Sequence, residues 1–396
     1  MQGPKREWRN NSGSSYVDGE KHMRSPASRT RCLVLPLAAM IFTVAVPAQR
    51  PDPNQPDMSI DAKDKAEAIR VLAQDIKETY VFPDLAGKLA NMLKGREARG
   101  EYDSVTSAKE FSALLTRQMS EIAHDAHLRV FYSSKALPPM AAEKPGAEPA
   151  PDPEMLLRLK KTNYGFEEAE RLRGNVGYLK LTAFAYPEPG GDTVAGAMAF
   201  LANTDALIID LRENGGGTPG MVALLASYFF SGDAPVHLND IASRKERSTE
   251  YDLAQWWTLP YVPGKRYVDK EVYILTSHST PSAAEEFTYD LQVLKRATVV
   301  GETTWGGANP GDRHRLGDHF QAFIPNGHAI NPITRTNWEG KGVEPDFKVP
   351  QEDALKTAQR MALQHLIGKT TDEQELNALK QALATTEAVQ GDHKKQ

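Results

Sequence analysis

The stretch Glu271–Thr304 constrains the fold most, because it holds several local patterns in a fixed order. It begins with a β-rich apolar run, Glu271–Thr276, and a turn, His278–Pro281. A helical segment, Ala283–Lys295, and a second β-rich run, Thr298–Val300, follow. Phe287, Leu291 and Leu294 fall on one face of the helical segment. A strand, a helix and a strand in succession predict a parallel or mixed sheet with helices on its faces.

Ser282 stands where the turn of this unit meets the helix. That corner lies at the carboxyl edge of the sheet, where open α/β folds place their sites. A helix start also offers free backbone N–H groups that can stabilise an oxyanion beside a nucleophilic hydroxyl. However, Ser282 and Glu285 also match the Ser-x-x-Glu pattern of a capping box, and capping is the commoner role of a serine at this position.

The remaining patterns predict a helical segment followed by an α/β core. Residues 58–132 show helical spacing in three stretches, Asp61–Tyr80, Leu85–Arg99 and Ser107–Ile122. Residues 133–153 are rich in Pro, Ala and Glu, which is typical of a linker. We expect the α/β core at 154–367, and a C-terminal helix with a disordered tail at 368–396.

Two details of the core can be predicted further. Ala206–Leu211 is almost wholly apolar, as strands of a buried parallel sheet are. Phe320–Ile324 and Gly327–Ile330 are expected to pair as a hairpin across Pro325-Asn326-Gly327.

The N-terminal region carries the pattern of an export signal. Cys32–Val46 is strongly apolar but, at about 15 residues, short for a membrane span. Arginines precede it, and small residues follow at Val46-Pro47-Ala48. We therefore predict a signal peptide at 23–48, cleaved after Ala48, and a secreted or periplasmic protein. A retained membrane anchor is the alternative, and residues 1–22 are expected to be a non-native or overcalled extension.

Charge and cysteine content exclude several classes of partner. The net charge is −5 with no basic block, so nucleic acid is not expected to bind. Cys32 is the only cysteine and would leave with the signal peptide. The exported chain would then have no disulfide, thiol nucleophile or cysteine metal site. Contact with a membrane is expected only through an uncleaved signal segment.

Three further places combine polar or glycine residues with the ends of predicted elements. His127, in His124-Asp125-Ala126-His127, could act as a general base, although a lone histidine is more often structural. The spacing is not that of a zinc helix, and no metal is expected. Gly215-Gly216-Gly217 follows a buried strand and suits either an oxyanion hole or a tight turn. Glu339 could orient an imidazole or lie in a surface turn.

At this point the chain resembles the S41 serine peptidases, the tail-specific or C-terminal processing proteases. The resemblance lies in four ordered motifs, IDLRENGGG, TSHSTPSAAEEF, GETTWGGANPG and EGKGVEPD. The segment from YVFPDLAGKLANMLKGREARGEYDSVTSAKEF to HDAHLRVFY is similar to the helical domain in the branch named after interphotoreceptor retinoid-binding protein. The resemblance implies an α/β (α+β) core of crotonase/ClpP-like type after a small helical domain, without a PDZ domain.

The resemblance also implies roles for individual residues. Ser282 would be the nucleophile, and the backbone N–H of Ala283 with that of Gly216 or Gly217 would form the oxyanion hole. The processing proteases carry a lysine base where this chain has Gly307. The tricorn-like branch uses serine, histidine and glutamate, which match Ser282, His127 and Glu339.

This branch also has a serine just before its histidine, and here that position is Ala126. The sequence therefore predicts an exported serine peptidase that cleaves peptide or protein substrates without a cofactor. The alternative is a carrier of retinoid- or fatty-acid-type ligands on the same fold, with weak or no peptidase activity.

Overall fold

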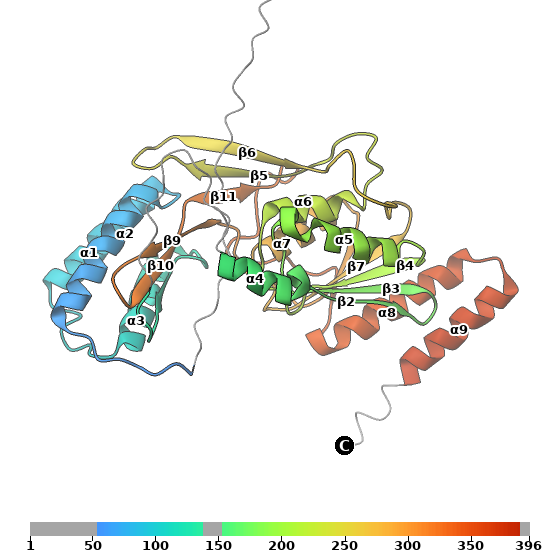
Figure 1. Cartoon of the computed structure of the whole chain (residues 1–396), viewed down its shortest axis with the longest axis horizontal. Coiled ribbons are helices and arrows are strands. Elements are labelled where there is room, and N and C mark those ends of the chain that lie inside the picture. The colour runs from blue at the N-terminus through green and yellow to red at the C-terminus, as the bar shows by residue number, and fades with distance from the viewer. Residues whose placement is uncertain (1–53, 138–152, 389–396) are drawn as a thin grey trace, which may run out of the picture. The chain divides into compact units, whose positions relative to one another are not determined.

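The computed structural model describes residues 54–137 and 153–388, and Figure 1 labels their helices and strands. The predicted signal peptide (23–48), the extension before it, most of the predicted linker and the final residues of the tail lie outside the described residues.

The predicted N-terminal helices are present. They are α1 (Ala62–Thr79), α2 (Pro83–Ala98) and α3 (Ala108–Ala123). The side chain of Asp61 caps α1 and that of Ser107 caps α3, so each helix begins where a side chain can accept a free amide. Pro83 opens α2 at a position where no backbone donor is needed.

These helices share their core with strands from the far end of the sequence. Strand β1 (Arg129–Tyr132) pairs antiparallel with β10 (Phe320–Pro325), which pairs in turn with β9 (Gly311–Arg315). Phe320 packs edge-on against Phe111 of α3, with ring centroids 5.5 Å apart. The N-terminal helices are therefore fixed to strands that lie about 200 residues later in the chain.

The central sheet is mixed, as the sequence predicts. Its strand order is β12-β8-β7-β4-β3-β2. The strands span Phe347–Lys348 (β12), Thr298–Gly301 (β8), Glu271–Thr276 (β7), Ala206–Asp210 (β4), Val176–Leu181 (β3) and Phe166–Leu172 (β2). Strand β2 runs antiparallel to β3, and the other neighbours pair in parallel. The Ser282 corner therefore lies at the carboxyl ends of parallel strands.

Helices cover both faces of this sheet (Figure 1). Helices α5 (Pro187–Leu201), α6 (Pro219–Ser227) and α7 (Ala283–Val293) pack on one face, and α8 (Gln351–Lys369) and α9 (Glu373–Ala388) on the other. Alternate side chains of β4 divide between the two layers, with Leu207 and Ile209 on the first face and Ala206 and Ile208 on the second. This alternation explains why the strand is apolar throughout.

The hairpin predicted across Pro325-Asn326-Gly327 is wrong. Strand β10 pairs with β1 and β9, whereas β11 (Gly327–Ile330) pairs with β5 (His237–Arg244) in another sheet. That sheet has the order β11-β5-β6, and β6 spans Tyr251–Trp257. Only Asn326 separates β10 from β11, which is too short a connection for a two-residue hairpin loop. The chain instead passes from one sheet directly into the next.

Several elements were not predicted from the sequence. Besides β2, β5, β6, β9 and β12, these are the helix α4 (Pro153–Lys161) and the short 3₁₀ turn η1 (Asn163–Gly165). Among the described helices, none combines the length and the apolar character that a membrane span requires.

Truncation of Phe320 tests the shared core between the N-terminal helices and the later strands. Phe320→Ala should lower the free energy of unfolding by about 3–5 kcal/mol, because it removes a ring that is 3% exposed. The control is Phe200→Ala on α5, where the ring is 59% exposed and the change should stay within about 0.5 kcal/mol. Urea unfolding of the two variants gives the comparison, and equal losses would contradict the shared core.

Candidate active site

Ser282 has a backbone conformation that an ordinary helix cap does not have. Its φ is 55° and its ψ is −123°, whereas N-cap residues normally lie in the extended region. Such a conformation costs a non-glycine residue about 1–3 kcal/mol and is found preferentially at active sites. Its backbone N–H donates to Glu285 Oε2 at 2.8 Å. The residue therefore resembles a nucleophile on a sharp strand-to-helix turn more than a simple cap.

The glycine turn after β4 lies directly against Ser282. A Cβ added at Gly216 would stand 3.0 Å from Ser282 Cβ and 3.5 Å from its Oγ. At Gly217 the φ is 148°, and a Cβ would stand 1.9 Å from the carbonyl oxygen of Phe184. Both positions therefore need glycine, because the turn approaches the serine on one side and a strand end on the other.

The three predicted oxyanion donors differ in their availability. The N–H of Gly216 already donates to Asn214 Oδ1 at 2.8 Å. Within the described chain, the N–H groups of Gly217 and Ala283 have no hydrogen-bond acceptor. Ala283 is the first residue of α7, where amides are free of intrahelical partners. Gly217 and Ala283 are thus the two amides that remain available to an oxyanion.

Glu285 connects the serine turn to the loop after β8. Its carboxylate accepts from the amides of Gly306 (2.6 Å) and Gly307 (2.9 Å), from the Thr304 hydroxyl and from the Ser282 amide. The side chain is fully buried, and burial raises its pKa to about 7. The sequence predicted Glu285 only as half of a capping box, because its contacts with a distant loop leave no local pattern.

His127 lies between two aromatic rings. Its imidazole packs edge-on against Trp305, with centroids 4.9 Å apart, and is tilted against Phe323 at 5.5 Å. Its Nδ1 is buried and has no hydrogen-bond partner among the described residues. Burial, followed by the charge of Arg129, lowers the pKa of His127 to about 3. The ring is therefore neutral near pH 7, which is the state a general base requires.

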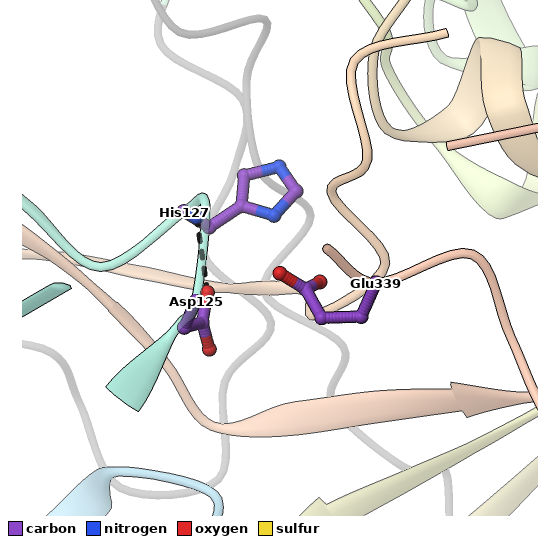
Figure 2. Close-up of side chains that lie close together, drawn as sticks. All are labelled: Asp125, His127 and Glu339. Atoms are coloured by element: carbon purple, nitrogen blue, oxygen red, sulfur yellow. Dashed lines mark hydrogen bonds between the residues drawn. The ribbon is translucent and has the colours of Figure 1, made fainter. Parts of the chain in front are cut away.

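The Glu339 carboxylate points towards the imidazole of His127 (Figure 2). Atoms of Asp125, His127 and Glu339 lie within 4.8 Å of one another. Glu339 is held by two backbone amides, Ala126 to Oε1 at 3.0 Å and Ala308 to Oε2 at 2.6 Å. Burial, and then the charge of Asp125, raise its pKa to about 7.

Asp125 supports the backbone of the histidine. Its Oδ1 accepts from the His127 amide at 3.0 Å, the dashed line in Figure 2, and its Oδ2 accepts from Tyr80 (3.2 Å) and Asn309 (2.9 Å). Burial raises its pKa. The sequence analysis named Asp125 only within the histidine motif and gave it no role of its own, although an acid two residues before a candidate base was a usable signal.

The three residues place two carboxylates beside an imidazole, without a hydrogen bond from the described imidazole to either of them. Each oxygen of Asp125 and of Glu339 already accepts at least one N–H or O–H donor. These donors take up part of the lone-pair capacity that a metal ion would use. Orientation of His127 by Glu339 stays a prediction.

Gly307, the position of the lysine in the processing proteases, lies against His127. A Cβ added there would stand 2.5 Å from His127 Cε1 and 2.4 Å from Trp305 Cζ3. Any side chain at position 307 would therefore overlap the imidazole. The observed placement of His127 requires glycine at this position.

The predicted site residues thus form a connected group drawn from distant parts of the chain. Ser282 and the 304–307 loop are joined through Glu285, Gly307 of that loop contacts His127, and the next residue, Ala308, is bound by Glu339.

Family models match both parts of the chain. Residues 175–349 match peptidase family S41. Residues 63–165 match the N-terminal domain of S41 peptidases in eukaryotic IRBP. The core therefore belongs to peptidase family S41, and that family's N-terminal domain type precedes it.

The chain is similar to curated proteins and to solved structures. A "Probable CtpA-like serine protease" of Staphylococcus epidermidis is 26% identical over 202 residues, which are 49% of this chain and 38% of that protein. The chain thus spans about two fifths of that relative's length. A lipoprotein from Streptococcus agalactiae has a TM-score of 0.49 at 13% identity, covering 76% of this chain and 97% of the other. The photosystem II D1 C-terminal processing protease has a TM-score of 0.43 at 14% identity, covering 74% and 94%.

Substitution of Gly307 tests the contact between the loop and the histidine. Gly307→Ala should lower the free energy of unfolding by about 1–3 kcal/mol, because the methyl group overlaps the packed rings of His127 and Trp305. Gly196→Ala on α5 is the matched control, since nothing lies within 4 Å of its added Cβ and alanine favours a helix. Thermal and urea unfolding measure both, and a neutral effect of Gly307→Ala would show that the imidazole lies elsewhere.

Proposed function

We propose that this chain is an exported serine peptidase that cleaves peptide bonds through an acyl-enzyme, with Ser282, His127 and Glu339 as its catalytic residues. The observation that carries the proposal is the strained Ser282 at the start of α7, beside the available amides of Gly217 and Ala283. A hydroxyl held in this way lies next to donors for the oxyanion that its attack creates. The S41 family match supports the same reaction class. Export would follow from the predicted signal peptide at 23–48.

The first half of the reaction forms the acyl-enzyme. Ser282 Oγ attacks the carbonyl carbon of the scissile bond while His127 takes the hydroxyl proton. The carbonyl oxygen becomes an oxyanion that accepts from the amides of Gly217 and Ala283. The tetrahedral intermediate then collapses, the C–N bond breaks, and His127 gives its proton to the departing amine. The acyl group remains as an ester on Ser282.

The second half returns the enzyme to its starting state. His127 takes a proton from a water molecule, whose oxygen attacks the ester carbon in front of the same two amides. The intermediate collapses to a carboxylic acid, and His127 returns the proton to Ser282. In both halves the Glu339 carboxylate stabilises the imidazolium that forms next to it. Hydrogen bonds of such groups are often longer in a free enzyme than in its substrate complex.

Histidine, rather than lysine, is the base in this proposal for a steric reason. His127 occupies the space that a side chain at position 307 would need. A lysine there would displace the ring, so the two types of base exclude each other in this site. The carrier function that the sequence left open has less support, because it gives no reason for a strained serine beside free amides.

The nucleophile is tested by a serine-reactive fluorophosphonate probe and by digestion of a peptide library. Ser282→Ala should abolish labelling and reduce cleavage by at least about 1,000-fold, because no other group forms the ester. Ser279→Ala is the matched control: this serine lies three residues earlier, is exposed, and should leave both signals unchanged. Labelling that persists in Ser282→Ala, or saturable fatty-acid binding by an unreactive wild type, would refute the peptidase.

The pH dependence tests Glu339 separately. A raised pKa means that Glu339 becomes ionised only as the pH rises through about 7. Because the carboxylate form stabilises the imidazolium, the second-order labelling rate should rise through this range and level off above it. Glu339→Gln should remove the rise and lower the plateau by about 100-fold or more. A profile that is unchanged in Glu339→Gln would assign the titration to another group.

A further inference from the structure

A second group of buried polar side chains lies on α7, outside the catalytic machinery. Glu286 and Asp290 are four residues apart, so they project from the same face of the helix. Glu286 is 5% exposed and Asp290 is fully buried. Neither side chain takes part in the hydrogen bonds at Ser282, and neither forms an ion pair with any described residue. The proposed reaction gives these two acids no role.

Two carboxamides from the β11-β5-β6 sheet complete the group. Asn239 of β5 is fully buried and lies close enough to Glu286 to lower the pKa of that carboxyl. Asn331, just after β11, donates through Nδ2 to Asp290 Oδ1 at 3.2 Å and to the Leu238 carbonyl at 3.4 Å. Its own Oδ1 accepts from the amides of Ile333 and Thr334. Asn331 therefore fixes the orientation of Asp290 and leaves the other carboxylate oxygen free.

Three oxygens of this group are buried and lack a donor of standard hydrogen-bond geometry. They are Glu286 Oε1, Asp290 Oδ2 and Asn239 Oδ1, whereas the Asn239 amide lies against the Glu286 carboxyl and lowers its pKa. Buried polar atoms in native proteins are almost always satisfied by protein, by ordered water or by an ion. Leaving one unsatisfied costs about 1–3 kcal/mol, so several in one cluster favour a partner from outside the chain.

The missing partner has to supply positive charge. Glu286 and Asp290 are both buried next to each other, and burial in a dry environment disfavours the charged form of a carboxyl. Two adjacent carboxylates cannot both stay ionised in a dry environment without a counter-charge. Because no described arginine or lysine pairs with them, that charge comes from protons or from a bound cation.

We propose that Glu286, Asp290 and Asn239 bind a hard divalent cation of the Ca²⁺ or Mg²⁺ class. The chemistry matches, since all three free atoms are oxygens of carboxylate or carboxamide groups, which such cations prefer. The charge also matches, because two carboxylates balance a divalent ion. Asn331 does not bind the ion but orients Asp290, one of the ligands, by donating a hydrogen bond to its Oδ1. The ion would fasten α7, the helix that begins at Ser282, to strand β5.

This site is separate from the reaction, so its test does not depend on the peptidase. The purified full-length chain is analysed for bound metal, stripped with EDTA, and unfolded thermally in chelated buffer with and without millimolar CaCl₂ or MgCl₂. We expect about one bound ion per chain and a rise of several degrees in Tm with at least one of the two salts. The salt that gives the larger rise identifies the cation.

Isosteric variants show whether the Tm response to the salt arises at this cluster. Asp290→Asn and Glu286→Gln should each abolish the Tm response, because each removes a charged ligand at nearly constant volume. Asp192→Asn, an exposed acid on α5, is the control and should respond as the wild type does. If Asp290→Asn does not fold, the Tm responses of Glu286→Gln and of the wild type still test whether the cluster binds the ion.

Two results would overturn the proposal. One is a wild type that carries no divalent ion and whose Tm responds to neither salt, which would assign protons or water to the cluster. The other is a response of equal size in Glu286→Gln and the wild type, which would place the ion elsewhere.

Discussion

The Glu285 carboxylate is the interaction on which the rest of the site depends. It holds the Ser282 amide on one side and the Gly306 and Gly307 amides on the other. The first contact supports a serine in a conformation that costs free energy, and the second fixes the loop that contacts His127. A buried carboxylate can do this only with several donors at once, because each hydrogen bond offsets part of the cost of its burial. Without those donors, nothing would fix the serine turn relative to the 304–307 loop and to the imidazole that the loop contacts.

The two halves of the site come from distant segments of the chain, which the pairing of strand β1 with β10 brings together. His127 precedes β1, whereas Ser282 begins α7 and Glu339 follows β11. The shared core around Phe320 therefore has a catalytic consequence: it sets the position of the base relative to the nucleophile. The three carboxyls near His127 and Ser282 also influence one another, since the charges of Asp125 and Glu285 both raise the pKa of Glu339. Packing and electrostatics are thus coupled across the whole site.

Much of the fold could be predicted from local patterns, and the exceptions have physical causes. The three N-terminal helices and the β4, β7 and β8 strands follow from periodicity and caps, because each pattern is complete within its own segment. Strands β5, β6 and β9 were missed, because their sequences (HLNDIASR, YDLAQWW and GDRHR) lack a strict alternation of apolar and polar residues. The supposed hairpin at Pro325 failed because turn residues indicate a change of direction but not which strand comes next. The predicted capping box of Ser282 and Glu285 is present, but the contacts of Glu285 with the 304–307 loop join distant segments and have no local pattern.

The sequence by itself determined the mixed α/β core, the helical segment before it, and the candidates Ser282, His127, Glu339 and the glycine turn. These follow from residue type and spacing, which are local properties, and from the resemblance that the ordered motifs carry. Only the tertiary structure decided which amides stay free, which carboxylates are held by backbone donors, and why glycine at position 307 accompanies a histidine. It also gathered Glu286, Asp290 and Asn239 into one dry cluster. Burial and hydrogen-bond satisfaction depend on contacts between distant segments, and no local pattern records them.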